Sequence, residues 1–94
     1  MYIVNLTYHR PIAEVDNHLE GHIAWLKTYF QDGTFIASGR KNPRTGGVIL
    51  VKSMDRAQLD AIVAQDPYNA VAHYEITDVG LSTTASGFEL LAGL

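Results

Sequence analysis

Apolar and polar residues alternate directly after Met1, and a period of two residues is typical of a strand with one buried face. One face would carry Tyr2, Val4, Leu6 and Tyr8, and the other Ile3, Asn5 and Thr7. The segment His9-Arg10-Pro11 then interrupts the pattern, since proline cannot donate a hydrogen bond to a neighbouring strand. We therefore predict a first strand over residues 2–8.

The pattern then changes to a helical period, with apolar residues three and four positions apart. This period predicts a single helix over residues 12–31, which ends at Asp32-Gly33. Its apolar centre would consist of Leu19, Ile23, Leu26 and Phe30. A neighbouring seam of polar aromatic side chains holds His18, His22, Trp25 and Tyr29. Such a seam suits the wall of a cleft, although a helix–sheet boundary also takes these residue types because their polar tips stay hydrated.

Three further strands complete the pattern. Residues 35–38 and 48–51 predict short strands, joined by a polar loop over residues 39–47. Both faces of the 48–51 segment are apolar, so we expect both to be buried. Residues 70–79 alternate again and predict a fourth strand.

The second helix has clear start and stop signals. Asp55 stands at the N-cap position with Gln58 three residues later, which is the spacing of a capping box. The apolar face of this helix holds Leu59, Ile62 and Val63. Pro67 ends the helix, because the residue before a proline is pushed out of the α region.

The order β-α-β-β-α-β is that of a ferredoxin-like α+β domain. Two helices would cover one face of a four-stranded sheet and leave the other face open. An open face with apolar residues favours pairing with a second copy, so we expect a homodimer, with higher homo-oligomers left open. Residues 81–87 read as a loop, and we expect the apolar tail that follows, residues 88–94, to pack on a partner subunit.

Composition and charge narrow the classes of protein. With 94 residues, 47% apolar and 18% charged, the chain fits one small globular domain rather than a disordered segment. The net charge is −3 and no basic run is longer than Arg40-Lys41, which argues against nucleic acid as a partner. No signal peptide or membrane span is visible, so we expect a cytoplasmic protein without membrane contact. The chain has no cysteine, which excludes disulfides, thiolate zinc sites and cysteine nucleophiles.

Two residues are candidates for proton transfer. His22 belongs to the residue type that titrates near neutrality, and Asp66 opens the rigid turn Asp66-Pro67-Tyr68. A carboxylate beside an imidazole fixes the tautomer of the ring and stabilises the imidazolium. The sequence leaves two other interpretations open: His22 as a half-buried boundary residue, and Asp66 as a turn former that binds nearby backbone amides.

Other polar residues allow binding or metal ligation. Ser38 and Arg40 share a strand face, where they could bind a carboxylate or phenolate or simply mark the end of the strand. His18 and His22 have the i, i+4 spacing of a metal-ligand pair. No third ligand completes a familiar pattern, so we expect neither a metal nor another cofactor.

Several segments, in this order, resemble the YciI-like family of small proteins, and the similarity runs from about residue 2 to residue 79. The matching segments are the opening strand and residues 21–26, 33–39, 43–50, 66–68 and 74–76. They hold the helix around His22, a Ser-Gly strand end, a Thr-Gly-Gly turn and the Asp-Pro-aromatic triplet. On this basis we expect one domain over residues 1–80, followed by a tail over residues 81–94.

The resemblance implies a ferredoxin-like subunit that pairs into a dimeric α+β barrel. In the family, the positions matching His22 and Asp66 are proposed as an active-site dyad beside a cleft, and the position matching Ser38 lines that cleft. A relative in the group is a dehydrochlorinase acting on chlorinated hydroxyhydroquinones, and muconolactone isomerases share the wider barrel fold.

We therefore carry two hypotheses about function. The first is a cofactor-independent enzyme of lyase or isomerase type, acting on a small oxygenated substrate, aromatic ones included. In it His22 acts as general base and acid with Asp66 orienting it. Ser38 and Tyr68 would position the substrate and Arg40 would supply charge. The second is a non-catalytic module whose cleft binds a small ligand or stabilises a partner, because fold alone does not select a function.

Overall fold

Burial alternates along the first strand as its sequence pattern predicts, with Tyr2, Val4 and Leu6 buried on one face. The computed structural model describes all 94 residues. Its strands are β1 (Tyr2–Tyr8), β2 (Phe35–Arg40), β3 (Gly46–Val51) and β4 (Ala72–Asp78). Its helices are α1 (Ile12–Asp16), α2 (Leu19–Gln31) and α3 (Arg56–Val63), with short 3-10 helices η1 (Pro67–Ala70) and η2 (Glu89–Leu91).

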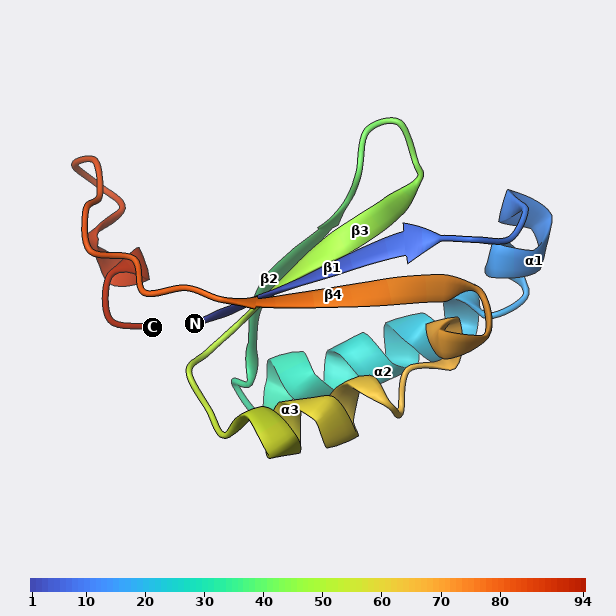
Figure 1. Cartoon of the computed structure of the whole chain (residues 1–94), viewed down its shortest axis with the longest axis horizontal. Coiled ribbons are helices and arrows are strands. Elements are labelled where there is room, and N and C mark those ends of the chain that lie inside the picture. The colour runs from blue at the N-terminus through green and yellow to red at the C-terminus, as the bar shows by residue number, and fades with distance from the viewer.

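The four strands form one antiparallel sheet in the order β2-β3-β1-β4. Figure 1 shows α2 and α3 side by side beneath this sheet, with no element on its other face. The predicted α+β fold of ferredoxin-like type is therefore confirmed. The edge strands are β2 and β4, and the central pair β1 and β3 lies over the core.

The predicted single helix over residues 12–31 is wrong, because the chain turns at Asn17 and His18 between α1 and α2. The backbone of His18 leaves helical geometry, with φ −108° and ψ 2°. Asparagine competes for backbone hydrogen bonds and favours such a turn. The break gives the two helices separate directions, so Val15 in α1 is fully buried while α2 runs along the sheet.

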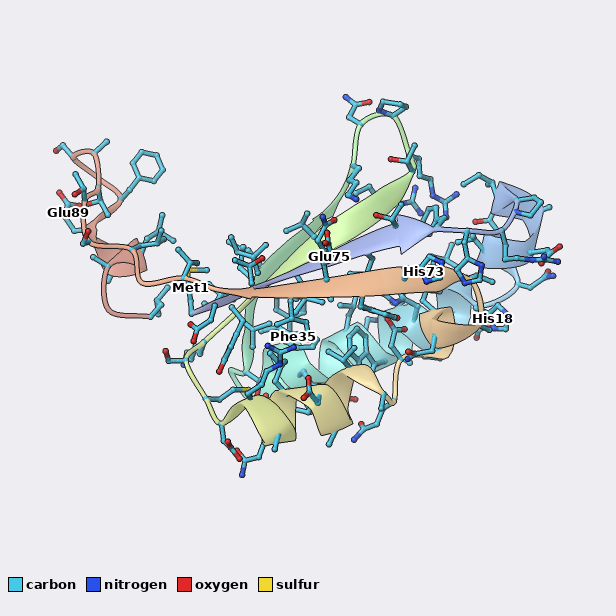
Figure 2. The ribbon with its side chains drawn as sticks, viewed as in Figure 1. Met1, His18, Phe35, His73, Glu75 and Glu89 are labelled. Atoms are coloured by element: carbon cyan, nitrogen blue, oxygen red, sulfur yellow. The ribbon has the colours of Figure 1, made fainter.

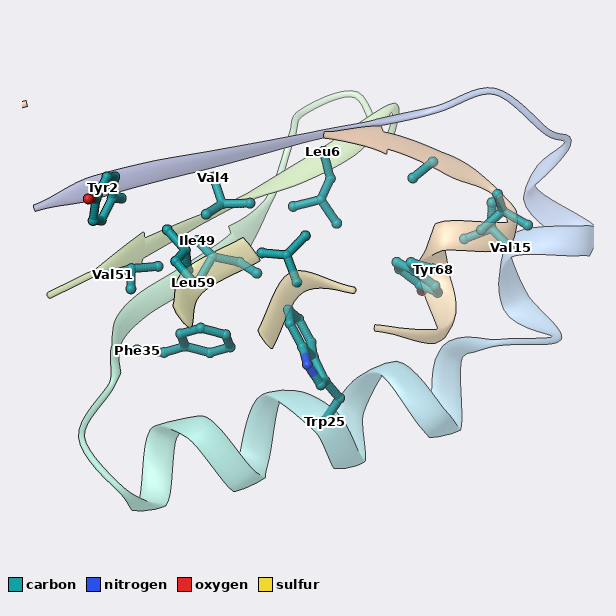
Figure 3. Close-up of a cluster of buried hydrophobic side chains, with 13 residues drawn as sticks. Tyr2, Val4, Leu6, Val15, Trp25, Phe35, Ile49, Val51, Leu59 and Tyr68 are labelled. Atoms are coloured by element: carbon teal, nitrogen blue, oxygen red, sulfur yellow. The ribbon is translucent and has the colours of Figure 1, made fainter. Parts of the chain in front are cut away.

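The predicted apolar centre of this helix is confirmed only in part, since Leu19 and Leu26 pack against the core but Ile23 and Phe30 are exposed. Trp25 is the buried residue of α2, and Figure 3 shows its ring pointing from the helix toward the sheet. Its indole nitrogen donates a hydrogen bond of 2.9 Å to the carbonyl oxygen of Ile62 in α3. Ile23 and Phe30 remain 42% and 38% exposed. Burying the large indole with its N–H satisfied centres the buried face of α2 on Trp25, between Leu26 and Tyr29, rather than on Ile23.

The other boundaries differ mainly at the ends of elements. Both β2 and β3 are longer than the predicted strands over 35–38 and 48–51, and the loop between them shrinks to residues 41–45. The fourth strand begins at Ala72 rather than residue 70, because η1 occupies the start of the predicted segment. Asp55 is the N-cap of α3 as predicted, but its side chain makes no capping hydrogen bond.

Burial of both faces of β3 is not observed in the single chain. Ile49 and Val51 are buried toward the helices, whereas Val48 and Leu50 are only partly buried. The reason is that no helix or loop covers the second face of the sheet (Figure 1).

The tail over residues 81–94 leaves the sheet after β4 and extends away from the body of the domain (Figure 1). Phe88 and Leu90 are 60% and 89% exposed, so most of the apolar surface of these side chains is left uncovered by the rest of the chain. Figure 2 places Glu89 of the tail and His73 of β4 at opposite ends of the molecule. No helix reaches the length and apolar character that crossing a bilayer requires.

Gly46, at the start of β3, lets this strand lie close to β1, and substitution of this glycine tests the pairing of the two strands. A Cβ at Gly46 would overlap the carbonyl oxygen of Leu6 in β1, whereas a Cβ at Gly39 would meet nothing. Gly46→Ala should therefore destabilise the fold by about 3 kcal/mol, at the upper end of typical overpacking costs. Gly39→Ala is the matched control and should leave stability unchanged or slightly higher. Urea unfolding midpoints that were equal in the two variants would contradict this register.

Candidate functional site

A cleft opens where the side chains on the covered face of the sheet become small. At one end of that face, Phe35 and Val51 fill the space between the sheet and α2. At the other end the corresponding positions of β2 and β3 are Ser38 and Gly47, which pair with Ile49 and Arg40. A cavity of about 200 Å³ results, bounded by α2 on one side and by β1, β2 and β3 on the other.

His22 projects from the first half of α2 into this cleft. Its Nδ1 atom lies 2.8 Å from Oδ1 of Asp66, and the two side chains are 13% and 0% exposed. Gly21 allows this approach, since a Cβ there would lie only 3.0 Å from Cγ of Pro67. The absence of a side chain at residue 21 thus lets α2 pack directly on the turn that carries the carboxylate.

Asp66 is a buried carboxylate, and both of its oxygens accept hydrogen bonds from groups of the protein. Oδ1 accepts from the backbone N–H of Tyr68 at 3.0 Å as well as from His22. Oδ2 accepts from the hydroxyl of Tyr74 at 2.6 Å. A buried carboxylate needs such partners, because an unpaired charge is costly away from water. Asp66 therefore serves both as turn former and as partner of the imidazole, the two roles that the sequence left open as alternatives.

Tyr68 supports the imidazole from one side. Its ring stacks on His22 with centroids 3.8 Å apart and planes 5° from parallel. The ring of Tyr8 meets Tyr68 edge-on at 5.8 Å, and the guanidinium of Arg44 lies 5.8 Å from the centre of the Tyr8 ring. Arg44 is held by Asp16 at 2.8 Å. Burial is the main cause that raises the pKa of Tyr68, so its phenol stays neutral.

Tyr74 is a site residue that sequence reasoning missed. It lies on β4 opposite Leu6 of β1, and its hydroxyl donates the hydrogen bond to Oδ2 of Asp66. Burial, followed by the hydrogen bond to Asp66 and its negative charge, raises the pKa of Tyr74 well above the usual range. The hydroxyl therefore stays protonated and keeps donating its hydrogen bond to Asp66. The signal in the sequence is the alternation of β4, which puts Tyr74 on the same face as Ala72 and Ile76.

The other predicted site residues gather around the same cleft. Ser38, Arg40 and Tyr68 all line it together with His22, while Asp66 lies behind the imidazole. Arg40 forms no ion pair, unlike Arg10, Arg44 and Arg56.

The remaining histidines lie outside this arrangement. His18 occupies the N-cap of α2 without a capping hydrogen bond, and it does not line the cleft. His9 and His73, for which the sequence shows no partner, lie against each other with ring centroids 4.4 Å apart. No three histidine or acidic side chains gather where they could hold a metal ion.

The arrangement can hold and move one proton. Because the Asp66 carboxylate accepts from Nδ1, the proton of the neutral imidazole lies on Nδ1 and the lone pair on Nε2. Tyr68 shields one face of the ring, and the remaining exposure of His22 is toward the cleft. Nε2 is thus the atom able to take a proton from a bound molecule and return it.

The sequence was compared with models of known protein families and matches one of them. A family model described as the YCII-related domain matches residues 1–80. This match spans the entire sheet, all three helices and every residue that lines the cleft, and it stops before the tail. A search of curated proteins finds no match.

The hydrogen bond from Tyr74 to Asp66 should contribute more to the free energy of unfolding than a hydrogen bond at an exposed position does. Tyr74→Phe removes a neutral donor from a buried charge, and we expect it to cost about 1.5–3 kcal/mol of unfolding free energy. Tyr29→Phe is the control, because the Tyr29 hydroxyl binds the uncharged side chain of Gln65 at an exposed position. Chemical denaturation measures both, and equal losses would contradict a special role for Tyr74.

Alkaline titration tests the same bond by a different observable. The folded-state pKa of Tyr74 is raised above that of the unfolded chain, so its contribution to stability is complete below pH about 10 and is lost as pH rises further. Part of the tyrosinate absorbance of the native protein should therefore appear only with alkaline unfolding. Tyr74→Phe should reduce that late portion. Complete, reversible ionisation near pH 10 in the folded protein would contradict the burial of this phenol.

Proposed function

This chain belongs to the family of YCII-related domains, and we propose that it is a small cofactor-independent enzyme of lyase or isomerase type. The observation that carries the proposal is the imidazole of His22, held through Nδ1 at 2.8 Å from a fully buried carboxylate while its other nitrogen is left for the cleft. A boundary histidine without a chemical role has no need of a buried, charged partner, which is costly to maintain.

In the proposed reaction, Nε2 of His22 takes a proton from a carbon atom made acidic by a neighbouring oxygen-bearing group. Asp66 stabilises the imidazolium that forms and keeps its orientation. The proton then returns to a different atom of the same molecule in an isomerisation, or to a departing group in an elimination. Stacking on Tyr68 keeps the ring in the same orientation throughout.

The cleft supplies the groups that would position a substrate. Ser38 offers a hydroxyl and Arg40 a guanidinium on the same strand, and the cavity is walled mainly by apolar side chains. A volume of about 200 Å³ limits the substrate to a small molecule. These features favour a small oxygenated substrate with an apolar or aromatic body.

The working unit that we propose is a homodimer joined through the open face of the sheet. Ile3, Leu50 and Ala37 lie side by side across β1, β3 and β2 on that face, with Val48 next to them. Together they form an apolar patch that no element of the chain covers. A second copy would bury it in the manner of a face-to-face sheet pair.

A hydrogen–deuterium exchange assay tests the catalytic proposal on a panel of compounds that carry acidic C–H bonds. Small lactones, enones and hydroxylated aromatics are incubated with the protein in D2O, and loss of C–H signals is followed by proton NMR. His22→Asn and Asp66→Asn should each slow the exchange by about 10²–10⁴-fold, the usual contribution of a positioned acid–base group. His18→Asn serves as the control, since His18 lies outside the cleft.

Exchange that His22→Asn leaves unchanged would refute the role of this histidine. Saturable binding of panel members by the wild-type protein, with no exchange on any of them, would instead support the non-catalytic module.

The mass in solution tests the proposed dimer. Light scattering on a sizing column should give twice the mass of the chain for the wild-type protein and the mass of a single chain for Leu50→Glu, which puts a charge into the apolar patch. Ala61→Glu, on the exposed side of α3, should leave the dimer intact. A Leu50→Glu protein with the wild-type mass would show that the patch is not the interface.

A further inference from the structure

The cleft carries one permanent charge, and that charge is positive. Arg40 is the only charged side chain among the residues that line the cavity, and neither an aspartate nor a glutamate lines it. The chain as a whole has a net charge of −3, so a cleft without acidic residues departs from the general character of the protein. Asp66 does not line the cavity, because it lies behind His22, and both of its oxygens already accept hydrogen bonds from protein donors.

Arg40 is also free to bind a ligand. Arg10, Arg44 and Arg56 each pair with a carboxylate at 2.7–2.9 Å, whereas Arg40 has no acidic partner. It lies two residues from Ser38 along β2, so the guanidinium and the hydroxyl belong to the same face of the strand. A guanidinium with a neighbouring hydroxyl is suited to the oxygens of a carboxylate.

The aliphatic stripe of α2 contributes the rest of the surface. Leu19, Ile23 and Leu26, which the sequence places at the apolar centre of the helix, all line the cleft. Leu19 and Leu26 also pack against the edge of the core, whereas Ile23 is 42% exposed. The side of these residues that faces the cavity looks toward Gly47, which has no side chain to fill the space. A ligand with an apolar body would therefore cover the part of the stripe that the fold leaves open.

From these three observations we propose that the cleft binds a small monocarboxylate with an apolar or aromatic body. Its carboxylate lies on Arg40 and Ser38, its body lies against Leu19, Ile23 and Leu26, and its reactive carbon faces His22. A phosphate monoester fits less well, because a single arginine in a mostly apolar cavity compensates one negative charge rather than two. A cavity of about 150 Å³ holds benzene, so about 200 Å³ accommodates one ring with a carboxylate.

This inference deepens the proposed function, since it names the substrate class of the same cleft, but ligand binding does not require proton transfer. Benzoate and benzamide provide a matched pair of probes, equal in shape and different in charge. Each is titrated into the ¹⁵N-labelled protein, and the backbone amide signals of Gly39, Gly46 and Gly47 are followed. Benzoate should shift these signals saturably and bind at least about tenfold more tightly than benzamide, as expected for a hydrogen bond to a charged group.

Arg40→Gln should lower the affinity for benzoate by about tenfold, to that of benzamide, while Arg56→Gln on α3 should have no effect. Equal affinity for the two probes, unchanged benzoate binding in Arg40→Gln, or the absence of any shift in the cleft would each overturn the proposal. Inorganic phosphate that binds more tightly than benzoate would overturn it as well.

The same titration separates this proposal from the catalytic one. If His22→Asn still binds benzoate while the wild-type protein exchanges no C–H proton of any panel compound, the carboxylate site stands and the enzyme proposal fails. If the wild-type protein exchanges C–H protons in a manner that His22→Asn abolishes, but binds benzoate no more tightly than benzamide, the enzyme proposal stands and the carboxylate site fails.

Discussion

The buried carboxylate of Asp66 is the constraint on which the arrangement of this domain depends. Removing a charge from water without partners costs several kcal/mol, so the fold must deliver donors to both oxygens. The three donors come from three places: His22 from α2, the backbone of Tyr68 from the turn itself, and Tyr74 from β4. A single carboxylate thereby ties a helix, a turn and a strand together, and Gly21 leaves the room that this packing needs.

The chemistry that we propose follows from how this carboxylate is satisfied. Once Asp66 accepts from Nδ1 of His22, the ring cannot rotate without breaking a buried charged hydrogen bond, and Nε2 becomes its free nitrogen. Small residues at one end of the sheet, Ser38 and Gly47, open a cavity in front of that nitrogen. Arg40 supplies the one positive charge there. The residues needed for stability and those proposed for function therefore overlap at His22 and Asp66.

Part of this organisation can be predicted from the sequence, because some signals act locally. The alternation of β1 and the stop imposed by Pro67 depend on the backbone within a few residues, and the structure has both. The rotation of α2 depends instead on which side chains the core can hold, and the indole of Trp25 takes the most buried position because Ile62 of α3 satisfies its N–H. The contribution of Tyr74 could not be predicted, since it requires the register of β4 against β1.

The tautomer of His22 is the property that tests the proposed chemistry most directly. The ¹⁵N spectrum of the imidazole, in protein labelled at histidine and assigned with the His22→Asn variant, reports which ring nitrogen carries the proton. We expect the neutral ring to carry its proton on Nδ1, hydrogen-bonded to Asp66, and Nε2 to have a free lone pair. A proton on Nε2 with Nδ1 bare would contradict this chemistry, because the nitrogen facing the cleft could then accept no proton from a substrate.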